Sequence, residues 1–428
     1  MQKHSCREAC KRNSVVSDLG SRARSSLSCI WQETPFFIIA ISLISSAIYT
    51  VEGVVSYTCD IPSSGEIVYL ETPFMARGLN LIRYYTYPDA AVEGVPESMP
   101  HSPYHEQWYF DVIADTFGVN MLRISLTSQF VEPVPGSGEL DSYFVGVLDE
   151  ELQWCIERDI KVILDCHIWG PNSYQWPPDT NEMWEEPSAW INWWDKLLGH
   201  YAAKGWLGNP VWGADLINEP SHGTLEQKRN AYESMLDTLH PKYPEVTFIL
   251  EGLGGTFSFP ITTYPDWSWL NNWTTKYDNK ILLDSHFYYD WAVLAWEEWQ
   301  CPTWAGLYQD GRYEEAKVQL YADLDRARAL QAGDIVDHDL GWAPFKGGSY
   351  LPYYCGEIGC GSGIDRMEPH KLHWLRDFLD YCESKSIQYL FWRYGAEVNY
   401  HEWACVEYDW KTPLPEGNVL IEYMERNP

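Results

Sequence analysis

The chain has 428 residues, of which 45% are hydrophobic and 15% aromatic, and its formal net charge is −31. This length and apolar content suffice for one large domain with a substantial core. The negative charge repels phosphate backbones and anionic lipid, so it argues against nucleic acid and polyanionic polymers as partners and favours a neutral ligand.

The first 53 residues differ in composition from the rest of the chain. Basic side chains are frequent in residues 1–34, and a largely apolar run follows at residues 36–51. A basic segment followed by such a run is typical of an export signal. The run is shorter than the roughly 20 residues that span a bilayer comfortably. We therefore expect a secreted protein, with an uncleaved membrane anchor at residues 36–51 as the alternative, and a single domain over residues 54–428.

Cysteine usage bears on the compartment and on metal binding. Three of the 11 cysteines precede the apolar run, and the eight that follow can form disulfides in an exported protein, with the pairing left open. No CxxC pair is matched by a second such pair, so the sequence does not predict a zinc site. We expect no metal and no cofactor.

Eight short apolar segments predict β-strands in this domain. Several are apolar at every position rather than at alternate ones, which is typical of parallel strands that are buried on both faces. In chain order, the predicted strands are residues 77–81, 119–126, 161–168, 214–217, 246–251, 281–287, 354–358 and 388–392.

Helical stretches alternate with these strands. In chain order, they are residues 104–117, 143–158, 188–201, 225–240, 314–331 and 369–384. The alternation predicts an α/β fold, a (β/α)8 TIM barrel built as a single domain. A doubly wound sheet is disfavoured because no glycine-rich phosphate-binding loop follows any strand. Residues 288–353 predict an enlarged loop region after the sixth strand, which we expect to border the functional cleft because it contains Trp291, Trp296, Trp299 and Trp304.

Polar or aromatic side chains end six of the eight predicted strands. Barrels of this kind carry their active sites at the C-terminal ends of the strands, so we expect these side chains to converge on one mouth. One histidine or arginine at a strand end is usually structural, but so many titratable groups together would leave buried charges unpaired outside a functional network. The residues are Arg123, His167, Asn218, Glu219, His286, Tyr288, Glu357 and Trp392.

Two motifs at these strand ends each contain a glutamate. The fourth strand leads into Asn218-Glu219-Pro220, and the seventh contains Gly356-Glu357. The first resembles the acid/base motif of glycoside hydrolase family 5, and the second resembles the nucleophile motif of that family. The resemblance covers residues 65–410. It implies a retaining β-glycosidase in which Glu219 protonates the glycosidic oxygen as catalytic acid/base and Glu357 attacks the anomeric carbon as nucleophile.

The resemblance also implies a substrate-binding role for the six remaining strand-end residues. They are Arg123 beneath the nucleophile, His167 and Asn218 at the sugar hydroxyls, His286 near the acid/base, Tyr288 near the nucleophile, and Trp392 as the floor of the sugar subsite before the cleaved bond.

The implied reaction is hydrolysis of a neutral polysaccharide by double displacement, without a cofactor. The 23 tryptophans and 29 tyrosines fit such a ligand, because aromatic rings pack against the apolar CH faces of sugars. We expect an endo-acting β-1,4-glucanase, with a β-mannanase or another β-glycosidase of the same superfamily as the alternative. A catalytically inactive carbohydrate-binding barrel and a metal-dependent barrel hydrolase are the alternatives from other classes.

Overall fold

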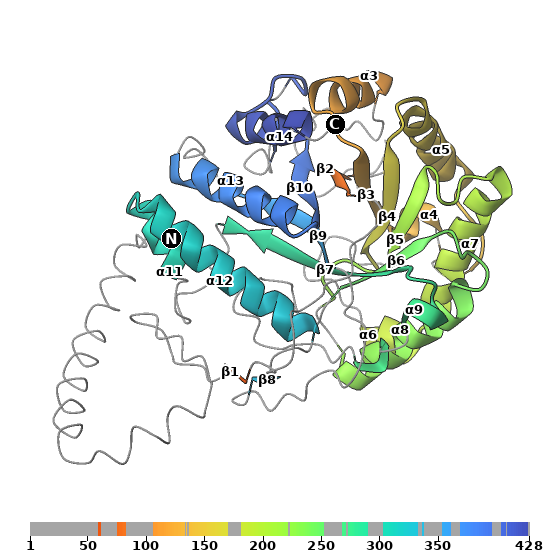
Figure 1. Ribbon diagram of the computed structural model, residues 1–428. Coiled ribbons are helices and arrows are strands. Elements are labelled where there is room, and N and C mark those ends of the chain that lie inside the picture. The colour runs from red at the N-terminus through yellow and green to blue at the C-terminus, as the bar shows by residue number, and fades with distance from the viewer. Residues whose placement is uncertain are drawn as a thin grey trace, which may run out of the picture.

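The computed structural model describes residues 59–60, 75–82, 106–132, 134, 137–169, 181–220, 223–251, 268–270, 273–289, 303–332, 336–337, 353–360, 369–395, 404–407 and 409–426. Within them, parallel strands close into a barrel in the order β10, β2, β3, β4, β5, β6, β7 and β9 (Figure 1). The strands are β2 (Arg77–Ile82), β3 (Met121–Thr127), β4 (Lys161–Ile168), β5 (Val211–Asp215), β6 (Thr247–Glu251), β7 (Ile281–Tyr288), β9 (Tyr353–Gly359) and β10 (Gln388–Tyr394). The predicted (β/α)8 TIM barrel is confirmed.

The fourth barrel strand differs most from its predicted bounds. β5 spans Val211–Asp215, whereas the sequence predicted residues 214–217. The strand includes Gly213, where a Cβ would lie 3.1 Å from Ile163 Cγ1 and 3.3 Å from the Thr247 carbonyl oxygen, so glycine allows the neighbouring strands to pack closely here. Asn218 and Glu219 consequently lie beyond the end of β5, in a bend at the mouth of the barrel.

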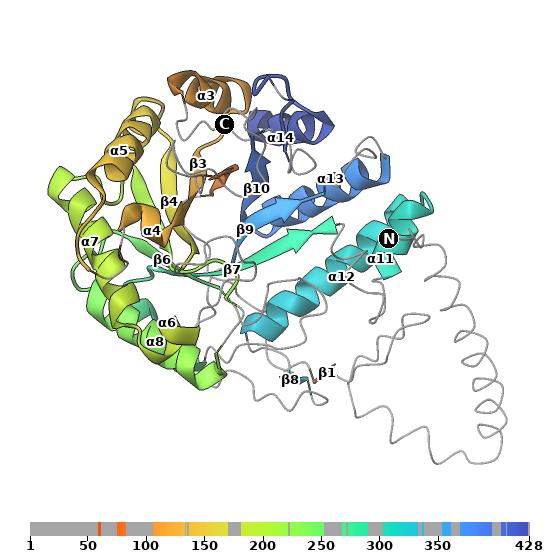
Figure 2. The same cartoon turned by 180° about the vertical axis from the view of Figure 1, so that it is seen from behind.

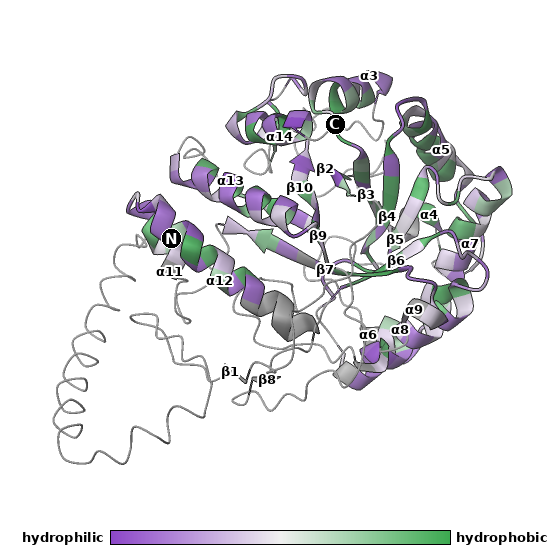
Figure 3. Ribbon diagram, in the orientation of Figure 1, coloured by the Kyte–Doolittle hydropathy of each residue, from purple (hydrophilic) through white to green (hydrophobic). Residues whose placement is uncertain are grey.

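Helices form a ring outside the barrel, as both Figure 1 and the view from behind in Figure 2 show. Figure 3 shows hydrophobic and hydrophilic residues mixed along them, as in amphipathic helices that cover a core on one face. The longer helices are α5 (Ser142–Glu157), α7 (Ser188–Lys204), α8 (Leu225–Leu239), α12 (Tyr313–Ala332), α13 (Pro369–Ser384) and α14 (Pro415–Arg426). The shorter ones are α3 (Gln107–Asp111), α4 (Ser128–Val131), α6 (Asn181–Glu185), α9 (Trp273–Lys276) and α11 (Thr303–Gln309).

Two helical predictions need correction. The predicted helix at residues 104–117 is α3 followed by a π-helical turn at Val112–Thr116, because Phe117 N–H bonds to the Val112 carbonyl at 3.2 Å. No helix was predicted at α14, which buries Val419 and Tyr423 against the domain. The helical spacing of apolar residues after Pro415 could have predicted this helix.

The enlarged region after β7 contains both helix and loop. Helices α11 and α12 lie within it, and α12 packs beside α13. Trp304 is fully buried on α11 and stacks on Phe287, so this tryptophan packs in the core, and that the region borders the cleft stays a prediction. The other three tryptophans of this region lie outside the described residues. A short strand β8 (Val336–Asp337) pairs antiparallel with β1 (Cys59–Asp60).

Side chains inside the barrel change from apolar to polar along the strand direction. An apolar cluster near the strand starts consists of Ala76, Met121, Ile163, Ile249, Leu282, Tyr354 and Leu390. Side chains on one face of a strand recur at every second residue, so the next inward positions follow directly. They are occupied by Arg123, Asp165, Glu251 and Asp284, all of them buried. The barrel therefore has an apolar floor beneath a charged layer, and the site rests on that layer.

The predictions for residues 1–53 lie outside the described residues. Among the residues that the structure describes, no helix is both long and apolar enough to cross a membrane. Four buried cysteines, Cys155, Cys166, Cys355 and Cys405, are free thiols.

Candidate active site

Arg123 is the central cation of the barrel interior. Its side chain is fully buried on β3, and it donates to Glu357 at 2.6 Å, to Asn218 at 2.8 Å and to Asp215 at 2.9 Å. Burial alone would lower the pKa of the guanidinium, but the surrounding carboxylates outweigh burial and raise the pKa well above its ordinary value. Arg123 therefore carries a permanent positive charge that holds several strands of the barrel together.

Glu357 lies on β9 with both carboxylate oxygens occupied. Oε1 accepts from Arg123, and Oε2 accepts from the Tyr288 hydroxyl at 2.5 Å. The residue is only 3% exposed. Burial, followed by the neighbouring Glu357 charge, raises the pKa of Tyr288 well above its ordinary value, so the phenol keeps its proton and donates it. Arg123 and Tyr288 thus hold the Glu357 carboxyl group in one orientation with two hydrogen bonds.

Glu219 follows β5 and is held at its backbone as well as its side chain. Its φ angle is 42°, in the left-handed region that costs a residue with a side chain about 1–2 kcal/mol. The Glu219 N–H donates to Glu251 Oε2 at 2.5 Å, and the Glu219 carboxylate lies 2.8 Å from His286 Nδ1. This conformation turns the side chain toward the barrel mouth beside Glu357.

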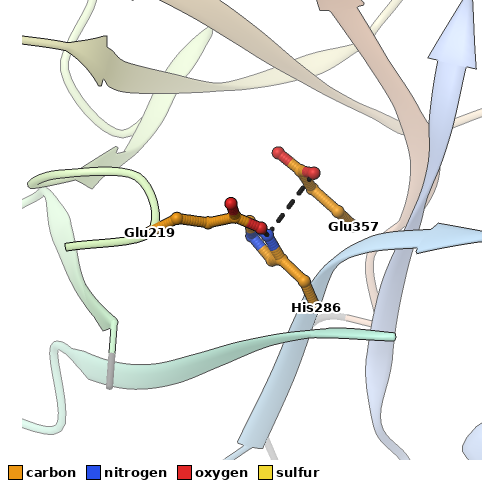
Figure 4. A group of neighbouring side chains, drawn as sticks. All are labelled: Glu219, His286 and Glu357. Carbon is orange, nitrogen blue, oxygen red and sulfur yellow. Dashed lines mark hydrogen bonds and ion pairs between the residues drawn. The ribbon is translucent and has the colours of Figure 1, made fainter. Parts of the chain in front are cut away.

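His286 links the two glutamates. The parallel register places His286 on β7 opposite Glu357 on β9, and its Nδ1 lies 2.8 Å from Glu219 and 3.4 Å from Glu357 (Figure 4). Burial would lower the pKa of the imidazole, but Glu357 and Glu251 outweigh burial and raise the pKa well above its ordinary value. The other ring nitrogen, Nε2, faces the carboxylates of Glu251 at 3.4 Å and Asp284 at 3.6 Å, so carboxylates lie on both sides of the ring.

The remaining predicted residues complete the mouth of the barrel. His167 Nδ1 lies 2.7 Å from Asp165, and the His167 ring stacks on Trp392 at 5.3 Å with an interplanar angle of 12°. Trp392, on β10, is partly exposed. Asn218 is anchored by its side-chain oxygen to Arg123. The structure thus brings all eight predicted residues together around one opening, although their roles stay predictions.

Two groups of three side chains are close enough to hold a metal ion. In each group the three potential ligand atoms lie within 4.8 Å of one another. The groups are Glu219, His286 and Glu357, and Glu251, Asp284 and His286. Both groups depend on His286. The carboxylates are already bound by hydrogen-bond donors, Glu357 by Arg123 and Tyr288 and Glu251 by Arg123 and the Glu219 N–H, so this donor set fits a hydrogen-bonded network better than a metal centre.

A buried layer beneath the predicted residues was missed in the sequence. It contains Asn80, Asp165, Asp215, Glu251 and Asp284. Asp284 accepts the N–H of Gly356 at 2.6 Å, and Asn80 donates to the Gly356 carbonyl at 2.7 Å. The spacing of Asp165 and Asp284 could have predicted this layer. Each lies two residues before a predicted site histidine, His167 or His286, and therefore on the same inward face of its strand.

Gly356 allows Asp284 of this layer to pack directly against the backbone next to Glu357. A Cβ at position 356 would lie 2.1 Å from Asp284 Oδ2, which is far inside van der Waals contact. We expect Gly356→Ala to lower the free energy of unfolding by about 1–3 kcal/mol, as overpacking does, and to reduce activity by displacing Glu357. Calorimetric melting temperatures and initial rates check this. The control is Gly146→Ala on α5, where a Cβ meets nothing within 4 Å and stability should rise slightly. Equal melting temperatures for the two variants would contradict the expectation.

The chain is similar in sequence and fold to known glycosidases. Solved structures with this fold include an endo-β-1,4-glucanase from Xanthomonas axonopodis pv. citri, with 16% identity over 82% of this chain and 100% of that one and a TM-score of 0.55. Another is the Pseudomonas stutzeri endoglucanase Cel5A in complex with cellobiose, with 17% identity over 82% of this chain and 92% of that one and a TM-score of 0.52.

Sequence comparison identifies the family. No match was found among curated proteins. The family model described as Cellulase (glycosyl hydrolase family 5) matches residues 87–398. That match spans most of the barrel, from before β3 to beyond β10. The chain therefore belongs to glycoside hydrolase family 5.

Proposed function

We propose that this glycoside hydrolase is a retaining endo-β-1,4-glucanase, with Glu219 as acid/base and Glu357 as nucleophile. The proposal rests on the pair of carboxylates at the barrel mouth. One oxygen of Glu219 and one oxygen of Glu357 lie within 4.8 Å of each other. Retaining enzymes separate these groups by about 5–5.5 Å, whereas inverting enzymes leave about 6.5–9.5 Å for a water molecule. The short separation supports a covalent glycosyl-enzyme.

The neighbours of each carboxylate support the division of roles. Glu357 is paired with Arg123 and Tyr288, which stabilise its negative charge before attack. Glu219 has His286 as its partner, and a histidine can keep it oriented as it gives up and regains a proton. In the first step Glu357 bonds to the anomeric carbon while Glu219 protonates the departing oxygen. In the second step Glu219 takes a proton from water, which attacks the same carbon and releases Glu357.

Hydrolysis of soluble polymers tests the substrate and the class together. We expect release of reducing ends from a soluble β-1,4-glucan in excess chelator, with a β-mannan as the parallel substrate and product anomers followed by NMR. Faster cleavage of mannan would identify the alternative glycosidase. No release from either polymer would favour the inactive binding barrel, and loss of activity in chelator would favour metal dependence. Export directed by residues 36–51 is part of the proposal, since such polymers are extracellular.

Trp392 offers a test of sugar binding at the barrel mouth. We expect Trp392→Ala to reduce kcat/KM by about 2–10-fold, because aromatic stacking contributes on the order of 0.5–1.5 kcal/mol, while the melting temperature changes little. The matched control is Trp374→Ala on α13, which is fully buried and should lose about 3–5 kcal/mol of stability instead. Steady-state kinetics and thermal melts separate the two. A large melting-point drop with unchanged kinetics in Trp392→Ala would assign that ring to the core.

A further inference from the structure

We infer that Glu251, at the end of β6, is a positioning residue that holds the acid/base Glu219 in its working conformation and couples it to Arg123 and His286. The inference rests on the proposed function and assigns a role to a residue outside the family motifs quoted above. Glu251 is fully buried and belongs to the layer beneath the mouth, so it does not touch substrate.

The two oxygens of Glu251 divide their contacts between the two catalytic halves of the site. Oε2 accepts the backbone N–H of Glu219 at 2.5 Å. Oε1 accepts from Arg123 at 3.2 Å and lies 3.4 Å from His286 Nε2. Arg123 in turn binds Glu357, so one carboxylate connects the acid/base to the cation that holds the nucleophile.

Only a carboxylate can accept hydrogen bonds on both oxygens. The Glu219 N–H donates to one oxygen of Glu251 and Arg123 donates to the other, so both oxygens must accept. A glutamine of the same size would direct its NH2 group at one donor or another and leave two donors facing each other. Burial raises the pKa of Glu251 to about 7, while His286 and Arg123 oppose the rise. The carboxylate is therefore ionised on the alkaline side of neutrality, where both of its oxygens can accept these hydrogen bonds.

The Glu219 backbone explains why such a partner is needed. Glu219 has a positive φ of 42°, and a strained conformation persists only where its surroundings enforce it. The bond to Glu251 acts on the N–H of the strained residue itself. From the other side, Lys228 on α8 donates to the Pro220 carbonyl at 2.8 Å, so the turn is held at both ends.

The leaving group of the substrate separates a positioning role from a structural one. Glu251→Gln should misplace Glu219, and a misplacement of about 1 Å costs on the order of 100-fold in rate. We expect that loss in the hydrolysis of cello-oligosaccharides, which need a general acid, and not in the burst phase with dinitrophenyl cellobioside, because formation of the glycosyl-enzyme from this substrate needs no acid. Rates are compared on the alkaline side of neutrality.

Asp215→Asn is the matched control. Asp215 is an equally buried carboxylate whose hydrogen-bond partner among the described residues is Arg123, at 2.9 Å. Loss of the Asp215 carboxylate should displace Arg123 and with it Glu357. The reaction should therefore slow to the same extent with both substrates. If Glu251→Gln also slows both alike, Glu251 is structural and the inference is overturned. If the wild type hydrolyses neither substrate, the proposed function is wrong and the inference falls with it.

A measurement on the wild-type protein covers the case in which Glu251→Gln does not fold. An amide that donates to a carboxylate over a short distance has a strongly downfield proton resonance, so we expect this for Glu219 after selective labelling with ¹⁵N-glutamate. An ordinary amide shift for Glu219 would show that the bond to Glu251 is absent, and would overturn the inference whatever the activity.

Discussion

Glu357→Ala is expected to abolish hydrolysis of polysaccharide, with a loss of kcat on the order of 10⁵-fold or more, comparable to removal of other enzymatic nucleophiles. The alanine leaves Arg123 and Tyr288 without the carboxylate that they bind, and no covalent intermediate can form. Reducing-end assays on soluble β-1,4-glucan measure the loss.

Rescue of the Glu357→Ala variant by azide provides the positive control. Azide can enter the space vacated by Glu357 and attack the anomeric carbon of a dinitrophenyl glycoside, giving a glycosyl azide of inverted configuration whose anomer NMR identifies. Glu314→Ala, on the exposed face of α12, should keep wild-type rates. Near-normal activity of Glu357→Ala would show that the nucleophile lies elsewhere.

Glu219→Ala is expected to give a different result that depends on the substrate. Hydrolysis of an unactivated glucan should fall by about 10²–10⁴-fold, the usual contribution of general acid catalysis. Formation of the glycosyl-enzyme from dinitrophenyl cellobioside should continue, because dinitrophenolate needs no proton to depart. The second step still requires a base, so stopped-flow absorbance should record a burst followed by slow turnover.

Azide again tests the assignment of Glu219. It attacks the accumulated intermediate without base assistance, so it should accelerate the slow phase and yield a glycosyl azide of retained configuration. The contrast with the inverted product of Glu357→Ala distinguishes the two carboxylates. Equal losses on activated and unactivated substrates, without a burst, would mean that Glu219 only binds or supports the site.

The barrel itself was predictable because its strands are short apolar runs that alternate with amphipathic helices. The mouth residues were predictable for a related reason, since His286, Glu357 and Trp392 are conspicuous where apolar strands end. Position within a strand sufficed in each case, and no knowledge of which strands pair was needed.

The charged layer beneath the mouth depends on closure of the barrel. The sequence indicates that Glu251 ends an apolar strand, but not that it meets Glu219 and Arg123 from other strands. Those contacts follow from parallel registers such as Glu251 opposite Asp284, which no local pattern specifies. The backbone angle of Glu219 was likewise beyond local propensity, because a positive φ is rare for glutamate and is imposed here by tertiary contacts.

If Glu219 is the acid/base as proposed, its backbone angle makes stability and catalysis compete at one residue. Glycine adopts a positive φ without steric cost, so a glycine at position 219 would relieve the strain and remove a buried carboxylate at the same time. The most stable version of this turn is therefore an inactive one. Directed evolution for heat resistance alone would drift toward that version, and only selection that also demands turnover would retain the glutamate.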